Sequence, residues 1–131
     1  TKLATDMASM FSLPAVECQV TFFSHFMSQP WLERWSECAA PLYRGYQIGL
    51  QRGETFTACQ CLGLACPMLF HCTILSEFEK KVRSIVETQL QLQGRAIHVQ
   101  FTEPYWQHSL NLLGRSEDAL ELNGEAMNEN D

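Results

Sequence analysis

The stretch PLYRGYQIGLQRGE, residues 41–54, decides the fold because it carries glycine at every fourth position, at Gly45, Gly49 and Gly53. Glycine inside a helix costs roughly 1 kcal/mol relative to alanine. Gly45 and Gly49 share one helical face, so the cost makes sense where a neighbouring helix approaches closely. Gly53 stands where a left-handed residue ends a helix. The stretch therefore predicts one half of a tightly packed helical hairpin.

Apolar residues at three-to-four spacing predict helices over most of the chain. We expect helices over about residues 15–28, 37–52, 54–72, 76–93 and 95–113. A short helical turn should carry Trp31 and Trp35. The helix over 54–72 is apolar on nearly every side and should be the most buried.

Prolines and helix ends refine these predictions. Pro41 should fall in the first turn of its helix, or kink that helix if it starts earlier. Pro67 should kink or break its helix near residues 63–65, and Pro104 should interrupt the last helix. Gly94 and Gly114 should end helices as Gly53 does. The spacing of Gly53 and Gly94 suggests stacked hairpins.

The residues Ser76-Glu77-Phe78-Glu79 have the pattern of a capping box. In that motif the serine hydroxyl and the second glutamate each bond an otherwise unpaired amide at the helix start. Glu79 and Arg83 also form a favourable pair four residues apart. The pattern predicts a helix that begins at Ser76.

Strand signals are weak, because no segment alternates apolar and polar residues for long; residues 96–101 are the nearest exception. We therefore predict an all-α fold of stacked antiparallel helical hairpins, a tetratricopeptide-like, α-solenoid-like array. Residues 15–114 should form this domain. Residues 1–14 should be a linker or a disordered N-terminal extension, and residues 115–131 an acidic linker that could lead into a further helix. We expect the chain to be a piece of a larger protein.

Charge and hydropathy exclude several classes of protein. The formal net charge is −6, and basic residues gather only at residues 80–83, so the chain would repel a phosphate backbone. The most apolar stretch, residues 61–75, is shorter than the ~20 residues that span a bilayer and is interrupted by Pro67 and His71. Residues 1–16 lack the pattern of a secretory signal. We predict a cytoplasmic protein that binds neither nucleic acid nor membrane.

The chain has six cysteines, which are Cys18, Cys38, Cys59, Cys61, Cys66 and Cys72. Three disulfides would suit a secreted protein, but four of the six fall in one predicted helix, whereas disulfide partners need different elements. We favour reduced thiols buried in a helical interior, where cysteine packs as a small hydrophobe.

A series of sequence blocks occurs in an order that is similar to a known family. The blocks are Trp31, Glu37-Cys38, Pro41-Leu42, Tyr43-Arg44-Gly45-Tyr46, Ile48-Gly49-Leu50, Gly53-Glu54, Leu110-Asn111-Leu112-Leu113-Gly114 and Leu122-Asn123-Gly124-Glu125-Ala126. Over residues 16–131 the chain resembles the tetratricopeptide-like helical region of multidomain signalling proteins of cyanobacteria and diatoms. In those proteins a protein-kinase-like segment and an AAA-type ATPase precede the helices, and a histidine kinase or a nucleotide cyclase can follow. The resemblance implies an architectural or regulatory role.

The resemblance carries over no catalytic residue. The segment contains neither a Walker lysine loop nor a glycine-rich loop after a strand. Glu54 stands where the family has aspartate, and it should cap the following helix less well.

One cluster of residue types could form a soft metal site. Zinc needs four thiolate or imidazole ligands in a tetrahedron, and the candidates are Cys59, Cys61, Cys66, His71 and Cys72. The first two of these point about 200° apart on a helix, which argues against convergence. We favour buried thiols.

A thiol enzyme is a further hypothesis, with a cysteine nucleophile and His71, His98 or His108 as the base. Nothing in the sequence brings such a pair together. The apolar neighbours of Cys66 should raise its pKa rather than lower it.

Aromatic residues could also line a groove for a peptide or a ligand, as the concave faces of helical arrays do. The candidates are Trp31, Trp35, Tyr43, Tyr46, Tyr105 and Trp106. We favour core packing for them.

We therefore predict no catalytic, cofactor-binding or metal-binding residue and no cofactor. The expected function is a non-catalytic helical scaffold or interaction segment of a larger signalling ATPase or kinase, which relays or organises neighbouring modules. Its partners would be neighbouring domains of the same chain or other proteins. The alternative is an independent helical binding module for a small apolar ligand, a haem-like cofactor or a peptide, built around the helix at residues 66–72.

Overall fold

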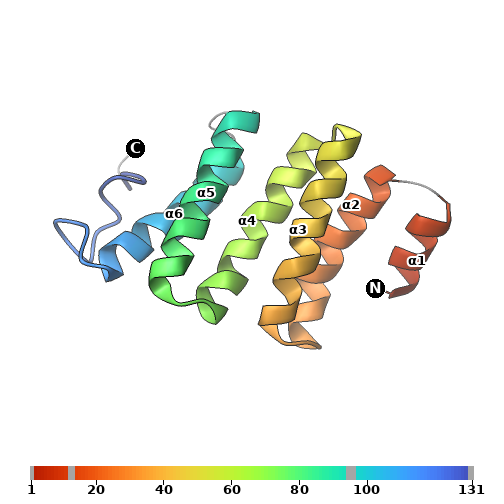
Figure 1. The fold of residues 1–131 in the computed structure, drawn as a ribbon, viewed down its shortest axis with the longest axis horizontal. Coiled ribbons are helices and arrows are strands. Elements are labelled where there is room, and N and C mark those ends of the chain that lie inside the picture. Colours follow the sequence, from red (N-terminus) through yellow and green to blue (C-terminus); the bar gives the residue numbers. More distant parts are fainter. Residues whose placement is uncertain (1, 12–13, 94–96, 130–131) are drawn as a thin grey trace.

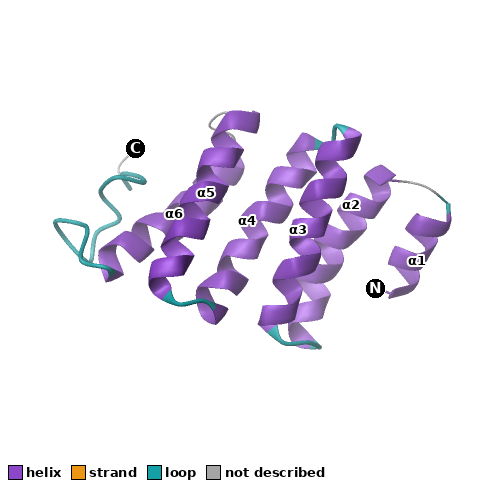
Figure 2. Ribbon diagram, viewed as in Figure 1, coloured by secondary structure: helices purple, strands orange, loops and turns teal. Residues whose placement is uncertain are grey.

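The computed structural model describes residues 2–11, 14–93 and 97–129. Within these residues the chain forms helices and no strand (Figure 2). The helices are α1 (Lys2–Met10), α2 (Pro14–Phe23), α3 (Trp35–Arg52), α4 (Thr55–Cys72), α5 (Leu75–Gln93) and α6 (Ile97–Leu112). A π-helical turn (Ser24–Ser28) and a 3-10 turn (Gln29–Trp31) connect α2 to α3. The prediction of an all-α fold is confirmed.

The helices stand side by side in a row, from α1 at the N-terminal end to α5 and α6 at the other (Figure 1). They pack antiparallel, with α3 against α4 and α5 against α6. The central helix is α4, which contacts α2, α3, α5 and α6, whereas α1 contacts α2. The prediction that residues 54–72 hold the most buried helix agrees with this central position.

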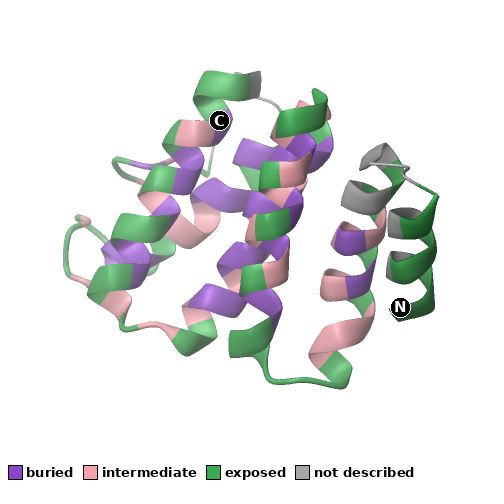
Figure 3. Ribbon diagram, turned by 45° about the vertical axis from the view of Figure 1, so that its right-hand side comes forward, coloured by how far each residue is buried: buried purple, intermediate pink, exposed green. Residues whose placement is uncertain are grey.

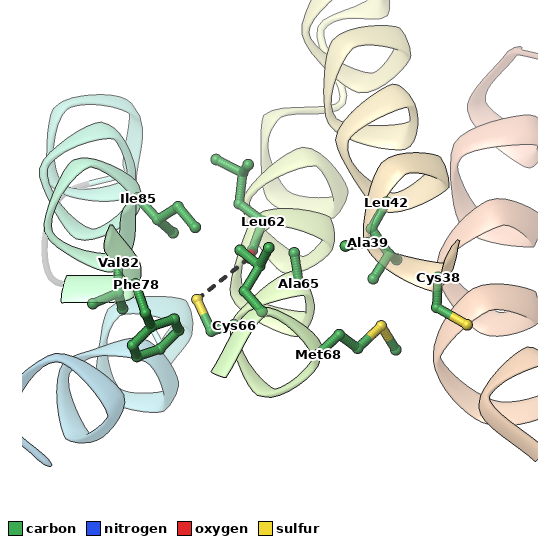
Figure 4. Packing of buried hydrophobic residues seen from close by; sticks show 11 residues of the cluster. Cys38, Ala39, Leu42, Leu62, Ala65, Cys66, Met68, Phe78, Val82 and Ile85 are labelled. Atoms are coloured by element: carbon green, nitrogen blue, oxygen red, sulfur yellow. Dashed lines mark hydrogen bonds between the residues drawn. The ribbon is translucent and has the colours of Figure 1, made fainter. Parts of the chain in front are cut away.

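The hydrophobic core lies on both sides of α4 (Figure 4). From α3 it receives Cys38, Ala39 and Leu42, and from α5 it receives residues that include Phe78 and Val82. Figure 3 shows the buried residues concentrated in the middle of the row, whereas the described residues of α1 are exposed. The row is therefore held together chiefly through α4.

The close approach predicted at Gly45 is confirmed. A Cβ atom at this position would lie 3.0 Å from Cys61 Sγ of α4 and 3.1 Å from Thr21 Cγ2 of α2. Real Cβ contacts are rarely so short, so the absence of a side chain lets α3 nest between two helices. Gly49 is also buried.

The helix ends predicted at Gly53 and Gly114 are confirmed. Both glycines are left-handed, with φ of 77° and 71°. At Gly53 two backbone bonds close the helix, since the Glu54 amide donates to the Gly49 carbonyl and the Gly53 amide to Leu50. Glu54 is the N-cap residue of α4, and its side chain makes no capping bond, as expected of a poor cap. Gly94 lies outside the described residues.

The predicted capping box is wrong. The helix α5 begins at Leu75, so Ser76 lies within it, and the two amides that follow Ser76 donate to the carbonyl of Ile74 at 2.9 and 2.8 Å. The carboxylate of Glu79 instead accepts from Arg83, whose Nη2 lies 3.1 Å away. The predicted pair of Glu79 and Arg83 is thereby confirmed.

The predicted effects of proline are wrong in part. Pro41 lies inside α3 rather than in its first turn, because the helix begins earlier than predicted. The helices α4 and α6 run through Pro67 and Pro104 without a break. Proline leaves the carbonyl four residues earlier without its amide partner. For Pro41 and Pro104 that carbonyl belongs to Glu37 and Gln100, both exposed, so water can bond it.

The chain ends hold further structure. The helix α1 lies within the segment for which a linker or disordered extension was predicted, and the described residues after α6 contain no further helix. The domain boundaries themselves stay a prediction. By length and composition α4 is the one described helix that could cross a membrane, and half of it is buried inside the protein.

Candidate functional site

An open pocket of about 540 Å³ lies over α4, between α2 and α6. Its lining is mostly apolar and comes from three helices and the π-helical turn. The lining residues are Phe22, Phe26, Phe56, Gln60, Gly63, Leu64, Pro67, Ile97, His98, Phe101 and Tyr105. Pockets of 300–1,000 Å³ with apolar walls and a few polar groups are typical of small-molecule sites.

Helical spacing explains why these residues meet. Residues four apart share a face of a helix. Phe22 and Phe26 stand four apart on one side of the pocket, and Phe101 and Tyr105 do so on α6 opposite. The lining residues of α4, residues 56–67, form the floor between them. The pocket is thus made by three largely apolar helix faces that border one hollow.

The pocket exposes aromatic surface to solvent. Phe56 is 50% exposed and Phe101 is 69% exposed, although both line the same hollow. Burying an apolar side chain of this size gains about 1.5–3 kcal/mol. Binding of an apolar group that covers these rings is therefore favoured by the burial of their apolar surface.

Of the residues that the structure describes, three polar side chains line the pocket, and none of these three is a carboxylate, an ammonium or a guanidinium. They are Gln60, His98 and Tyr105. His98 is 3% exposed and its Nε2 has no hydrogen-bond partner. Burial lowers the pKa of His98 below its usual 6.5, so its imidazole is neutral at pH 7. The ring of Phe56 packs edge-on against it, with centroids 4.4 Å apart.

A smaller hollow of about 190 Å³ adjoins this pocket, because Phe26 and Pro67 line both. Its other walls include Trp31 of the 3-10 turn and Trp35 at the start of α3. Trp31 is 86% exposed. The apolar surface therefore continues along α4 toward the connection between α2 and α3.

The residues proposed for a metal site do not converge. Cys61 turns its sulfur toward Gly45 of α3, whereas the thiol of Cys66 donates to the Leu62 carbonyl within α4 at 3.7 Å. His71 and Cys72 are exposed at the end of α4. In the part of the chain that the structure describes, no group of three or more His, Cys, Asp or Glu could hold a metal ion.

The proposed thiol nucleophile also lacks support from its surroundings. Burial raises the pKa of Cys66 to about 12, as the sequence predicted, and it raises the pKa of Cys59 as well. The three candidate bases pack against aromatic rings: His71 on Trp35, His98 on Phe56 and His108 on Phe70. A buried thiol with a raised pKa is a poor nucleophile.

The predicted aromatic candidates are dispersed. Tyr105 lines the main pocket and the tryptophans Trp31 and Trp35 line the adjoining hollow. Tyr43 and Tyr46 line a separate hollow between α3 and α5. Most of the lining was missed as a site; the aromatic pairs four apart, Phe22 with Phe26 and Phe101 with Tyr105, signal apolar helix faces but not the hollow between them.

A second cluster, on the C-terminal half of α6, is polar and closed. The side-chain amide of Gln107 donates to Asn111 Oδ1 at 2.9 Å, and its carbonyl accepts from the Ala126 amide at 3.0 Å. Asn111 donates to the carbonyl of Glu121 at 2.7 Å. Gly124 fits against this cluster, since a Cβ there would lie 2.7 Å from Gln107 Nε2. We call this cluster, with the segment it holds, the C-terminal clasp.

Glu79 joins the clasp from α5, although it is 3% exposed. Its carboxylate accepts from Trp106 Nε1 at 3.2 Å and from Arg115 Nη1 at 3.4 Å, in addition to Arg83. Arg83 in turn contacts Glu125 at 3.2 Å. The acidic segment after α6 is thus held against α5 and α6 over residues 115–126.

Comparison of the chain with protein-family models, with curated proteins and with solved structures gave no match.

Proposed function

We propose that the chain is a non-catalytic helical binding module whose binding site is the pocket between α2, α4 and α6. The observation that carries this proposal is the exposure of Phe56 and Phe101 in a preformed apolar hollow. Soluble proteins that expose such surface commonly use it to bind a ligand or a partner. This is the alternative function expected from the sequence, but the site is no longer centred on residues 66–72: it is lined by residues 56–67 of α4 together with residues of α2, the π-helical turn and α6.

The arrangement of helices supports a tetratricopeptide-like array as the finer description of the fold. With α3–α4 and α5–α6 as successive hairpins, the second helix of each, together with α2, lines the pocket. Stacked helical repeats use one such row of helices as a binding surface. The pocket would then lie on the functional face of the array.

The scaffold function in a larger cytoplasmic signalling protein is the second candidate. The close packing at Gly45, which joins α3 to α2 and α4, favours it because such packing couples neighbouring hairpins rigidly. A ligand in the pocket would bridge α2, α4 and α6 and stiffen the row. Binding in the pocket and relay to neighbouring modules are therefore compatible functions.

The binding function is tested with Nile red, a neutral apolar dye that fluoresces in apolar surroundings. We expect saturable binding by the chain and binding about fivefold weaker in Phe101→Ser, since loss of apolar contact costs about 1 kcal/mol. Phe11→Ser is the matched control, because Phe11 is similarly exposed but lies beside α1, away from the pocket. Equal binding by the two variants would contradict the proposed site.

A further inference from the structure

We infer that the pocket takes a neutral, elongated apolar molecule that carries one hydroxyl group, and that this hydroxyl lies in the region of His98 and Gly63. The inference rests on the proposed function and specifies the ligand of the same site. Three features of the pocket lead to this inference. The described residues of its lining carry no charge, His98 Nε2 and the Gly63 carbonyl lack their usual hydrogen-bond partners, and the ring of Phe56 covers the imidazole of His98.

The charge of the lining excludes ionic ligands. Among the described residues that line the pocket, none is acidic and none is lysine or arginine, and the polar side chains are neutral hydrogen-bonding groups. An ion moved from water into an apolar site without an opposite charge pays a large desolvation cost. A fatty-acid carboxylate or an alkylammonium would therefore bind more weakly than the corresponding uncharged molecule.

The hydrogen-bonding positions of the pocket suit a hydroxyl group. His98 Nε2 is buried and unpartnered, and it either donates or accepts according to the tautomer of the ring. Pro67 has no amide hydrogen, so the carbonyl of Gly63 cannot receive the usual helical bond from it. A hydroxyl both donates and accepts, so it can serve an acceptor carbonyl and either tautomer of the imidazole.

The ring of Phe56 covers the imidazole of His98 edge-on, and a ligand would reach the imidazole when this ring turns aside. Phe56 stands in the first turn of α4 and is half exposed. A ring that is already half in solvent gives up little burial when it turns aside. The ligand chain then lies along α4 against Phe101 and Phe26, and its hydroxyl reaches His98 where Phe56 stood.

The experiment is displacement of Nile red at pH 8 by three molecules with the same ten-carbon chain: 1-decanol, decyl methyl ether and decanoate. We expect 1-decanol to displace the dye at the lowest concentration, about tenfold below decanoate, with the ether between them. His98→Phe keeps an aromatic ring but has no ring nitrogen, so it should remove most of the advantage of 1-decanol over the ether, with the two displacements compared within the variant at its own affinity for Nile red. A melting curve followed by circular dichroism establishes that the variant is folded.

Several results would overturn the inference. Decanoate that equals or exceeds 1-decanol contradicts the neutral-ligand claim on the wild-type chain alone, whether or not His98→Phe folds. An unchanged preference for 1-decanol in a folded His98→Phe contradicts the role of the imidazole. In both cases Nile red still binds and the proposed function stands, whereas a failure of Nile red to bind removes the proposed function and this inference together.

Discussion

The first half of α6 borders the open pocket, whereas its second half buries Gln107 and Asn111 beneath the chain's own C-terminal segment. In the first half, His98 keeps a buried nitrogen without a partner. In the second half, amide groups of both buried side chains bond to neighbouring groups. The polar groups in the second half of α6 are thus bonded by the chain itself, whereas in the first half a buried nitrogen is left that a ligand can bond.

This difference separates stability from binding. Satisfied buried polar groups fix a unique structure, because removing one partner leaves the other desolvated and unpaired. An exposed apolar hollow adds little to stability but offers free energy to a ligand. We therefore expect changes in the C-terminal clasp to alter the free energy of unfolding, and changes in the pocket to alter affinity.

The largest effect is expected from Gln107→Leu. The substitution leaves the Ala126 amide and Asn111 Oδ1 without a bond in a buried site. Each unpaired buried group costs about 1–3 kcal/mol, so the free energy of unfolding should fall by about 2–4 kcal/mol in urea titrations. Gln100→Leu, on the exposed face of α6, is the control and should change it by less than about 0.5 kcal/mol. Equal losses would mean that the clasp does not stabilise the fold.

A smaller effect is expected from Glu79→Gln, which keeps the shape of the side chain but removes its charge. Arg83 and Arg115 are partly exposed, so solvent weakens their ion pairs with Glu79. We therefore expect the loss of these pairs to lower the free energy of unfolding by about 1–2 kcal/mol. The matched control is Glu77→Gln, in the same helix but exposed. If Glu79→Gln were no more destabilising than this control, the buried carboxylate would not hold the segment after α6.

His98, in the half of α6 that borders the pocket, should make the free energy of unfolding depend on pH. The pKa of His98 is lowered in the folded state, so below about pH 6.5 the unfolded chain binds a proton that the folded chain does not. The contribution of the neutral His98 to the free energy of unfolding is therefore fully present above pH 6.5 and is lost as the pH falls from 6.5 through the pKa of the folded state. His98→Phe should show a smaller loss between pH 7 and pH 5 in thermal melts. Parallel pH curves for the two proteins would contradict a buried neutral His98.

The sequence predicted what depends on local rules. Gly53 and Gly114 end helices because a left-handed residue is needed there, and the spacing of Phe78, Val82 and Ile85 gives α5 its buried face. Gly63 was predicted only as a point of weakness in α4. Its missing side chain instead makes room for Gln89 and Thr102, since a Cβ would lie 3.2 Å from each.

The clasp and the pocket could not be predicted, because both depend on residues distant in the sequence. The capping box at Ser76 failed because α5 begins one residue earlier, at Leu75, and because the carboxylate of Glu79 is bound by Arg83 and, from far along the chain, by Trp106 and Arg115. The pocket joins aromatic residues of α2, α4 and α6, and periodicity shows only that each helix has an apolar face. Which of these faces stays open is decided by the packing of the row.

The most direct test of the account is an amide chemical-shift titration of the isotope-labelled chain with 1-decanol. We predict saturable shifts concentrated at Phe56, Gly63, His98 and Phe101, with little change at Gly124 and Ala126 in the clasp. Shifts spread evenly over the chain, or confined to the clasp, would contradict the claim that the pocket between α2, α4 and α6 is the binding site.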